Sequence, residues 1–176
     1  RGWVMQLHIG AERWTSSRLR KIAGPAGGYA GIGNSCCLRA VCDFLDGLDS
    51  DGLMPKTILY TLNPSDNAML ATLTGSFSES GVQKLQFGPA WWYNDHECGI
   101  KDNLDALGSY SLMSKSLGMT TDSRTILSFS RHDYFRRILC DYIGNRVERG
   151  ELPADPEFLG GVVTGISYKN ADKWIY

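Results

Sequence analysis

The sequence is most informative around one segment, Leu117-Gly-Met-Thr-Thr-Asp-Ser-Arg124. Its apolar start predicts a strand over 117–121, and the alternation of side chains along a strand then puts Asp122 and Arg124 on one face. The residues that follow, 125–149, predict a helix. An acid and an arginine are therefore expected together where a strand passes into a helix, which is where ligands bind in α/β folds.

Three earlier segments predict the same strand-then-helix unit. Residues 3–10 alternate between apolar side chains and the polar pair Gln6 and His8. The second and third strands are expected over 57–62 and 84–88. The further helices are expected over 35–47, 65–75, 100–112 and 155–176. Four units imply a parallel sheet, either half of an eightfold barrel or a small open sheet flanked by helices. No Gly-rich phosphate loop follows the first strand, which argues against an open nucleotide-binding sheet.

The segment between the first strand and its helix, residues 10–34, is too long for a plain connector. We therefore expect it to be a functional or lid-like loop. The chain starts at Arg1 instead of methionine and goes directly into the first expected strand. This beginning predicts a piece of a longer protein.

Composition narrows the class of protein. The 176 residues, 43% of them hydrophobic, predict one ordinary domain with a core. The 18 basic and 19 acidic residues are spread along the chain, which disfavours nucleic acid as a partner. No long apolar run and no signal-peptide pattern occur, so we expect no membrane partner and a cytoplasmic location. The five cysteines have no Cys-x-x-Cys spacing and are interpreted as reduced thiols.

Several polar or aromatic residues fall at or just beyond the expected carboxyl ends of the strands: His8, Asn63, Trp91, Asp122 and Arg124. Parallel strands would bring these ends to one edge, which is the main sign of a site. Each residue also has a plain structural interpretation. His8 could be an interior histidine, Asn63 a turn residue that starts a helix, and Trp91 a packing residue. Asp122 and Arg124 could form only a salt bridge.

Motifs spread over nearly the whole chain resemble one known family. They are Met5-Gln-Leu-His-Ile-Gly-Ala11, Pro55-Lys-Thr-Ile-Leu-Tyr60, Gln86-Phe-Gly88 with Trp91-Trp92, Thr121-Asp-Ser-Arg124 and Arg131-His132. In order and spacing they resemble uronate isomerase, also called glucuronate isomerase, of the amidohydrolase superfamily. The resemblance implies the C-terminal half of a (β/α)8 TIM-type barrel, with residues 1–176 as a single partial domain and the N-terminal half outside the chain.

The resemblance also implies an activity: aldose-ketose isomerisation of D-glucuronate to D-fructuronate, and of D-galacturonate to D-tagaturonate, in hexuronate catabolism. The expected partner is a small hexuronate, and the oligomeric state, with a homo-oligomer as one option, stays open. A divalent metal, with zinc the expected ion, is implied as cofactor. Two alternatives remain: a metal-dependent hydrolase of the same superfamily, and an inactive fragment.

Site residues follow from the matching motif positions. Asp122 matches an aspartate that binds the metal and takes part in proton transfer, and the other metal ligands are expected in the N-terminal half. Arg124 matches an arginine that contacts substrate, His8 a catalytic histidine, and Trp91 a tryptophan of the substrate pocket. Arg13, a few residues beyond His8, is a further candidate for substrate contact.

One loop departs from the family pattern. Where that pattern has Gly-Pro-Asp-Thr-Gly-Phe-Asp, this chain has Gly24-Pro-Ala-Gly-Gly-Tyr-Ala30. Two acidic positions are thereby lost, at Ala26 and Ala30.

Overall fold

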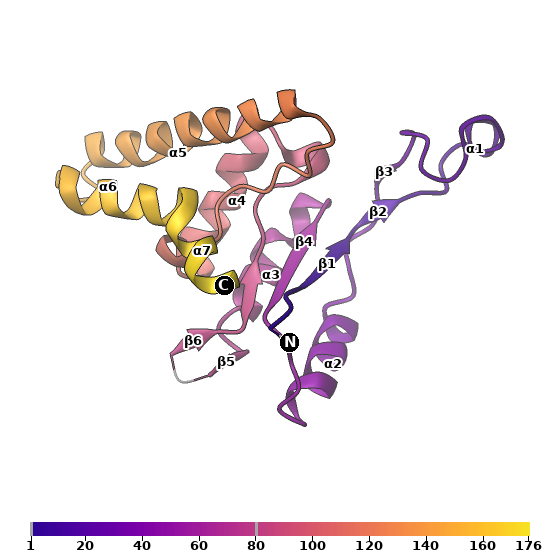
Figure 1. Ribbon diagram of the computed structural model, residues 1–176, viewed down its shortest axis with the longest axis horizontal. Coiled ribbons are helices and arrows are strands. Elements are labelled where there is room, and N and C mark those ends of the chain that lie inside the picture. Colours follow the sequence, from indigo (N-terminus) through magenta and orange to yellow (C-terminus); the bar gives the residue numbers. More distant parts are fainter. Residues whose placement is uncertain (1, 80) are drawn as a thin grey trace.

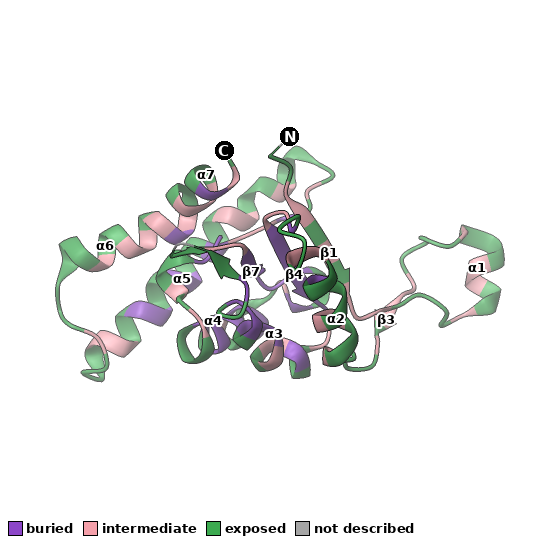
Figure 2. Ribbon diagram, turned by 90° about the horizontal axis from the view of Figure 1, so that it is seen from below, coloured by how far each residue is buried: buried purple, intermediate pink, exposed green. Residues whose placement is uncertain are grey.

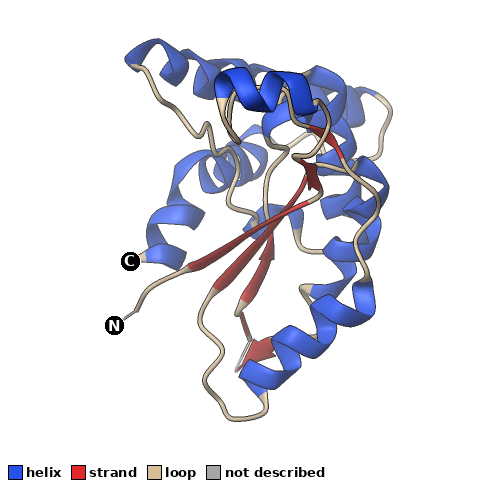
Figure 3. Ribbon diagram, turned by 90° about the vertical axis from the view of Figure 1, so that its right-hand side faces the viewer, coloured by secondary structure: helices blue, strands red, loops and turns tan. Residues whose placement is uncertain are grey.

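The computed structural model of the chain describes residues 2–79 and 81–176. Its centre is a parallel sheet in the strand order β1-β4-β7 (Figure 1). β1 (Met5–Ile9) pairs with β4 (Thr57–Thr61), and β4 pairs with β7 (Leu85–Phe87). The strands run alongside one another in Figure 3, with helices packed beside them. The expectation of an α/β fold with a parallel sheet is confirmed.

The middle strand, β4, is buried along its whole length because both of its faces are covered. Leu59 packs into one hydrophobic cluster, while Ile58 and Tyr60 pack into another, as the period of two requires. β1 is covered on one face only. Met5 and Leu7 pack against the first cluster, whereas Gln6 and His8 are exposed, so the predicted alternation is confirmed.

Helices α2 (Leu38–Asp49) and α3 (Asn67–Leu73) contribute to the first cluster, and α4 (Glu97–Tyr110) and α5 (Ser130–Glu148) contribute to a third. Figure 2 shows the buried residues gathered on the central strands and the adjoining helices. α2 begins at Leu38, later than the helix expected over 35–47, and its N-cap residue, Cys37, makes no side-chain hydrogen bond to it. In the described ranges no helix is long and apolar enough to cross a membrane.

The C-terminal segment is helical but not one regular helix. α6 (Pro156–Thr164) passes through a π-helical stretch (Gly165–Lys169) into α7 (Asn170–Ile175). The start of α6 agrees with the sequence, because the Asp155 carboxylate accepts hydrogen bonds from the backbone N–H groups of Glu157 at 3.1 Å and Phe158 at 3.0 Å.

The expected long loop after β1 contains secondary structure of its own. β2 (Ala11–Glu12) and β3 (Gly31–Ile32) form an antiparallel ribbon, and α1 (Ser17–Ala23) lies between them. Figures 1 and 2 both show this arm extending away from the body of the molecule. The sequence did not reveal α1 within the expected functional or lid-like loop, because a seven-residue helix with no buried residue has little apolar periodicity to detect.

The prediction of a fourth strand over 117–121 is wrong. These residues pair with no strand among the described residues, so the parallel sheet has three strands and not four. Gly118 (φ +73°) and Asp122 (φ +46°) have left-handed backbone. These left-handed residues interrupt the extended backbone that a ladder with β7 would need.

The remaining elements are short. A hairpin of β5 (Ser78–Glu79) and β6 (Val82–Gln83) precedes β7. Single 3-10 turns occur at Pro64–Asp66, Trp92–Asn94, Met113–Lys115 and Ile126–Phe129. The turn at 126–129 leads into α5, so the helix expected over 125–149 begins a few residues later than the pattern predicts.

Candidate active site

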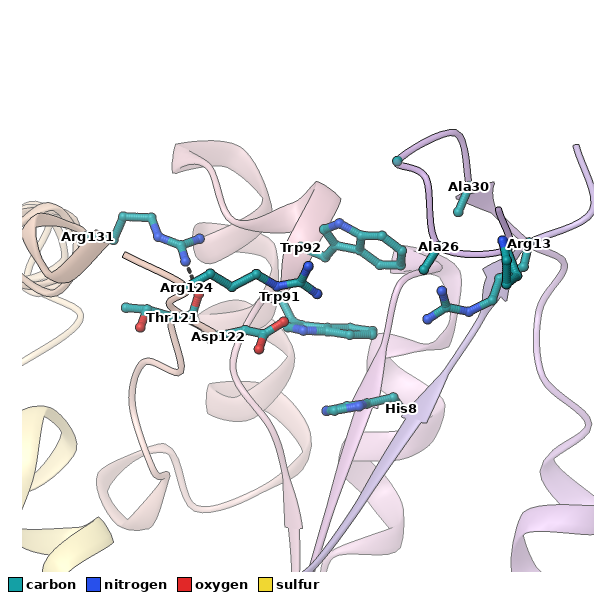
Figure 4. Close-up of a pocket in the computed structure, with 12 residues that line it drawn as sticks. His8, Arg13, Ala26, Ala30, Trp91, Trp92, Thr121, Asp122, Arg124 and Arg131 are labelled. Carbon is teal, nitrogen blue, oxygen red and sulfur yellow. Dashed lines mark hydrogen bonds between the residues drawn. The ribbon is translucent and has the colours of Figure 1, made fainter. Parts of the chain in front are cut away.

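A pocket of about 440 Å³ lies beyond the carboxyl ends of the sheet strands, between the arm and the segment around Asp122 (Figure 4). The predicted site residues His8, Arg13, Trp91, Asp122 and Arg124 all line it. Its remaining lining residues are Pro25, Ala26, Gly28, Ala30, Trp92, Thr121 and Arg131. Residues more than a hundred positions apart in the sequence therefore share one space.

The base of the pocket is aromatic. The His8 imidazole stacks on the Trp91 indole, with ring centroids 4.6 Å apart and planes inclined by 15°, and lies 5.0 Å from the Tyr60 ring. Trp91 and Tyr60 are buried. The Tyr60 hydroxyl donates to Gln6 Oε1 at 3.0 Å, and burial raises the pKa of this phenol. Contacts with two buried rings thus hold the His8 imidazole in orientation.

One wall of the pocket is a stack of aromatic and guanidinium groups. Trp92 stacks on Tyr93 at 5.1 Å, and the Arg13 guanidinium carbon lies 5.6 Å from the Trp92 ring centroid. Trp92 has left-handed backbone (φ +55°), a conformation that costs a tryptophan roughly 1 kcal/mol or more. The Tyr93 hydroxyl donates to the Ala30 carbonyl and so fastens this wall to the arm. The sequence points to Trp92 only as part of the Trp91-Trp92 motif, and it is not among the predicted site residues.

The backbone conformation that places Asp122 and Arg124 at the pocket is not the predicted strand. Because Asp122 has left-handed backbone, the simple alternation of a strand does not apply, yet both side chains line the pocket. Both residues are exposed. No hydrogen bond or ion pair joins either side chain to another described residue, so the two do not form a salt bridge with each other. Their charges are available to a ligand.

Arg131 is a pocket residue that sequence reasoning left without a role. Its guanidinium pairs with the Asp95 carboxylate and also donates to the Thr121 carbonyl. Burial raises the pKa of Asp95, and the neighbouring Arg131 opposes that rise. These partners are 36 and 10 residues from Arg131, so no local periodicity could have revealed the cluster.

Asn63 has the plain structural role and does not line the pocket. Its side-chain oxygen accepts from the Ser65 N–H at 3.0 Å, and its amide nitrogen donates to the Gly33 carbonyl at 3.0 Å. The interpretation of Asn63 as a turn residue at a helix start is therefore confirmed. Nearby Asp66 is buried, and its carboxylate accepts from Thr61 Oγ1 at 3.1 Å.

The described residues do not make a metal centre by themselves. In ranges 2–79 and 81–176 no group of three or more His, Cys, Asp or Glu side chains is placed to hold an ion. Among the described residues that line the pocket, Asp122 is the only acid and His8 the only histidine, and two ligands are fewer than a common metal site requires.

Fold and pocket together define an α/β protein with a polar, cation-bearing ligand pocket at the carboxyl edge of a parallel sheet. A sequence model of the glucuronate isomerase family matches residues 1–175, and the chain belongs to this family. The resemblance inferred from the motifs is confirmed.

Comparisons with individual proteins lead to the same family. The chain is 49% identical over 174 residues to the uronate isomerase of Caldanaerobacter subterraneus subsp. tengcongensis, covering 98% of the chain and 37% of the relative. It is 50% identical over 171 residues to the uronate isomerase of Halalkalibacterium halodurans, covering 97% and 36%. The crystal structure of uronate isomerase from Thermotoga maritima matches with a TM-score of 0.87 and 32% identity, over 99% of this chain and 37% of that one. The chain thus spans little more than a third of the relatives' length.

Proposed function

We propose that the chain is the catalytic C-terminal part of a uronate isomerase that interconverts D-glucuronate and D-fructuronate, and D-galacturonate and D-tagaturonate. The observation that carries the proposal is the shared pocket: His8, Arg13, Trp91, Asp122 and Arg124 line one space in a chain that belongs to the glucuronate isomerase family. A hexuronate is small enough for a pocket of about 440 Å³.

The first requirement of a uronate substrate is a cation for its carboxylate. Arg13 and Arg124 line the pocket, while the charge of Arg131 is paired with Asp95. A guanidinium offers a planar fork of donors that fits a carboxylate or a developing enolate. We assign Arg13 to substrate binding and Arg124 to both binding and catalysis. The buried Trp91 ring provides an apolar surface against which a sugar can pack.

The second requirement is proton transfer between adjacent carbons, because aldose-ketose isomerisation passes through an enediol. Asp122 can accept and return that proton, since its carboxylate is exposed to the pocket and has no partner in the described chain. The His8 imidazole, fixed by its stack on Trp91, can relay a proton. Arg124 stabilises the negative charge that develops on the substrate oxygens.

We also propose an architecture for the whole protein. The parallel order β1-β4-β7, with a pocket beyond the strand carboxyl ends, is compatible with half of a (β/α)8 barrel. In that arrangement the other strands, and the remaining ligands of a divalent metal bound partly by Asp122, come from sequence outside this chain. Zinc is the ion we expect there.

The test is isomerisation of D-glucuronate and D-galacturonate, measured as appearance of the ketose, by the polypeptide of the longest reading frame that contains this chain. The Asp122→Asn variant should lower kcat by about a hundredfold or more, because it removes the proposed base. Asp102→Asn, which changes an exposed aspartate on α4, should leave activity unchanged. Normal turnover by Asp122→Asn would refute the role of Asp122. Hydrolysis of an amide or lactone without ketose formation would favour the hydrolase alternative.

A further inference from the structure

Arg131 connects two parts of the pocket that are remote in sequence. It lies in the first turn of α5, and separate nitrogens of its guanidinium donate to the Asp95 carboxylate and to the Thr121 carbonyl. Asp95 ends the Trp-Trp-Tyr-Asn segment that forms the aromatic wall, and Thr121 directly precedes Asp122. One side chain thus ties that wall to the backbone beside Asp122.

Asp95 is too enclosed to act on a ligand itself. Only 3% of its side chain is exposed, it does not line the pocket, and its Oδ1 atom has no hydrogen-bond partner within the described chain. A carboxylate in such a place is costly unless a cation neutralises it. Its nearby cation is Arg131, whose side chain is 36% exposed and reaches the pocket. The buried acid therefore fixes the direction of the arginine.

The backbone next to Asp122 needs such a contact. Asp122 has left-handed backbone (φ +46°), which costs a non-glycine residue roughly 1 kcal/mol or more. The segment before it belongs to no strand ladder, so a sheet does not hold it in place. The bond from Arg131 to the Thr121 carbonyl holds the chain at the residue that precedes this turn.

We propose that Arg131, oriented by the buried Asp95, is a positioning residue that holds Asp122 in the pocket in its working geometry. This inference rests on the proposed function for its catalytic consequence, but the contact itself does not. Arg131 acts through the Thr121 backbone, and its paired charge leaves substrate recognition to Arg13 and Arg124. A lysine could not replace it, because an ammonium is a point charge without the fork that reaches both acceptors.

Two variants separate this role from simple loss of folding. Arg131→Lys keeps a cation for Asp95 and gives up the second contact. The double variant Asp95→Asn with Arg131→Met removes both charges, so no unpaired carboxylate is left buried, and it also loses the Thr121 contact. Arg137→Met is the matched control, since Arg137 lies on the same helix, is 80% exposed and pairs only with the exposed Asp133.

Two readouts are taken on the polypeptide of the longest reading frame that contains this chain. The first is trypsin cleavage after Arg124, timed by mass spectrometry under native conditions, which reports how often the segment around Asp122 leaves its place. Both Arg131 variants should be cut about tenfold faster there than the wild type. The second readout is steady-state kinetics. The same variants should lose about tenfold or more in kcat, with KM within about threefold of the wild type.

The outcomes are distinguishable. An unchanged cleavage rate after Arg124 in both variants would overturn the positioning contact. Faster cleavage with normal kcat in an active enzyme would overturn the claim that Arg131 positions Asp122 for catalysis. Equal effects of Arg137→Met on cleavage rate and kcat would overturn it as well. A large rise in KM with unchanged kcat would show that Arg131 binds substrate directly, which also contradicts the inference. If the wild type forms no ketose, the proposed function fails, while the cleavage rates still decide whether the pair holds the segment.

Discussion

Gly118 lies where the chain passes directly over the carbonyl of Ile166. Its backbone is left-handed (φ +73°), and a Cβ atom added there would lie 2.1 Å from that oxygen. Only glycine combines this conformation with so close an approach. The contact sets the path of the segment that leads to Asp122, so a residue outside the pocket helps to place a side chain inside it.

Replacing this glycine should be costly. We expect Gly118→Ala to lower the free energy of unfolding by on the order of 2 kcal/mol or more, from left-handed strain plus the clash with Ile166. Urea unfolding of this chain would measure it. Gly144→Ala on α5 is the control, since a Cβ there meets nothing within 4 Å, and it should be neutral or stabilising by up to about 1 kcal/mol. Equal stability of the two variants would contradict the role given to Gly118.

At the scale of elements, α4 and α5 are joined by a polar tie as well as by apolar packing. The buried Tyr142 donates its hydroxyl to Asp105 Oδ1 at 2.7 Å, and the Arg146 guanidinium donates to the same oxygen at 2.6 Å. Burial raises the pKa of Tyr142 to about 12, with Asp105 contributing and Arg146 opposing. The phenol is therefore held protonated by the folded state.

This tie predicts a loss of stability in alkali. Between pH 10 and 12 the folded state keeps a proton that the unfolded tyrosine has lost, so the free energy of unfolding falls as the pH rises through that window. The contribution of Tyr142 is on the order of 2 kcal/mol. Denaturant unfolding of Tyr142→Phe from pH 8 to 12 should show a shallower decline than the wild type. Tyr110→Phe, at an exposed tyrosine on α4, should follow the wild type; identical slopes for all three would contradict this assignment.

The elements that could be predicted from sequence are those with a strong local period. The sequence locates β1 because its apolar residues repeat every two positions, β4 because it is a short run buried on both faces, and α5 because Phe135, Ile138 and Leu139 follow helical spacing. The fourth strand was predicted wrongly because Gly118 and Asp122 leave the extended conformation, which residue types alone do not reveal. The arm escaped detection because its short helix buries nothing.

For the whole molecule, the pocket is a product of tertiary structure. His8, Trp91 and Asp122 could be nominated because parallel strands end at one edge. The contact of Arg131 with Asp95 and Thr121 could not be, since it depends on how α5 docks on two separate segments. Pro25, Ala26, Gly28 and Ala30 likewise join the pocket through tertiary structure, because the arm meets the aromatic wall where Tyr93 donates to the Ala30 carbonyl, and these four residues carry no charge.

A metal titration tests how the whole site is assembled. Calorimetry with Zn²⁺ should reveal no tight stoichiometric site on residues 1–176 alone, because the described ranges hold no group of three suitable ligands. The longer polypeptide should bind the ion, with affinity about tenfold or more lower in Asp122→Asn. Tight one-to-one binding by the short chain would show that it forms a complete centre and would contradict the shared-ligand proposal.

β1 is the outermost strand in the order β1-β4-β7, and one of its edges faces no other strand in the described chain. The backbone donors and acceptors along Met5–Ile9 on that edge are a template for a further strand. A recombinant preparation of this chain therefore has an exposed edge strand that can pair with other chains. A complementary polypeptide that supplies the neighbouring strand would pair with this edge and complete a split protein. Without such a partner, we expect the edge to pair with identical copies in concentrated solution, which leads to aggregation.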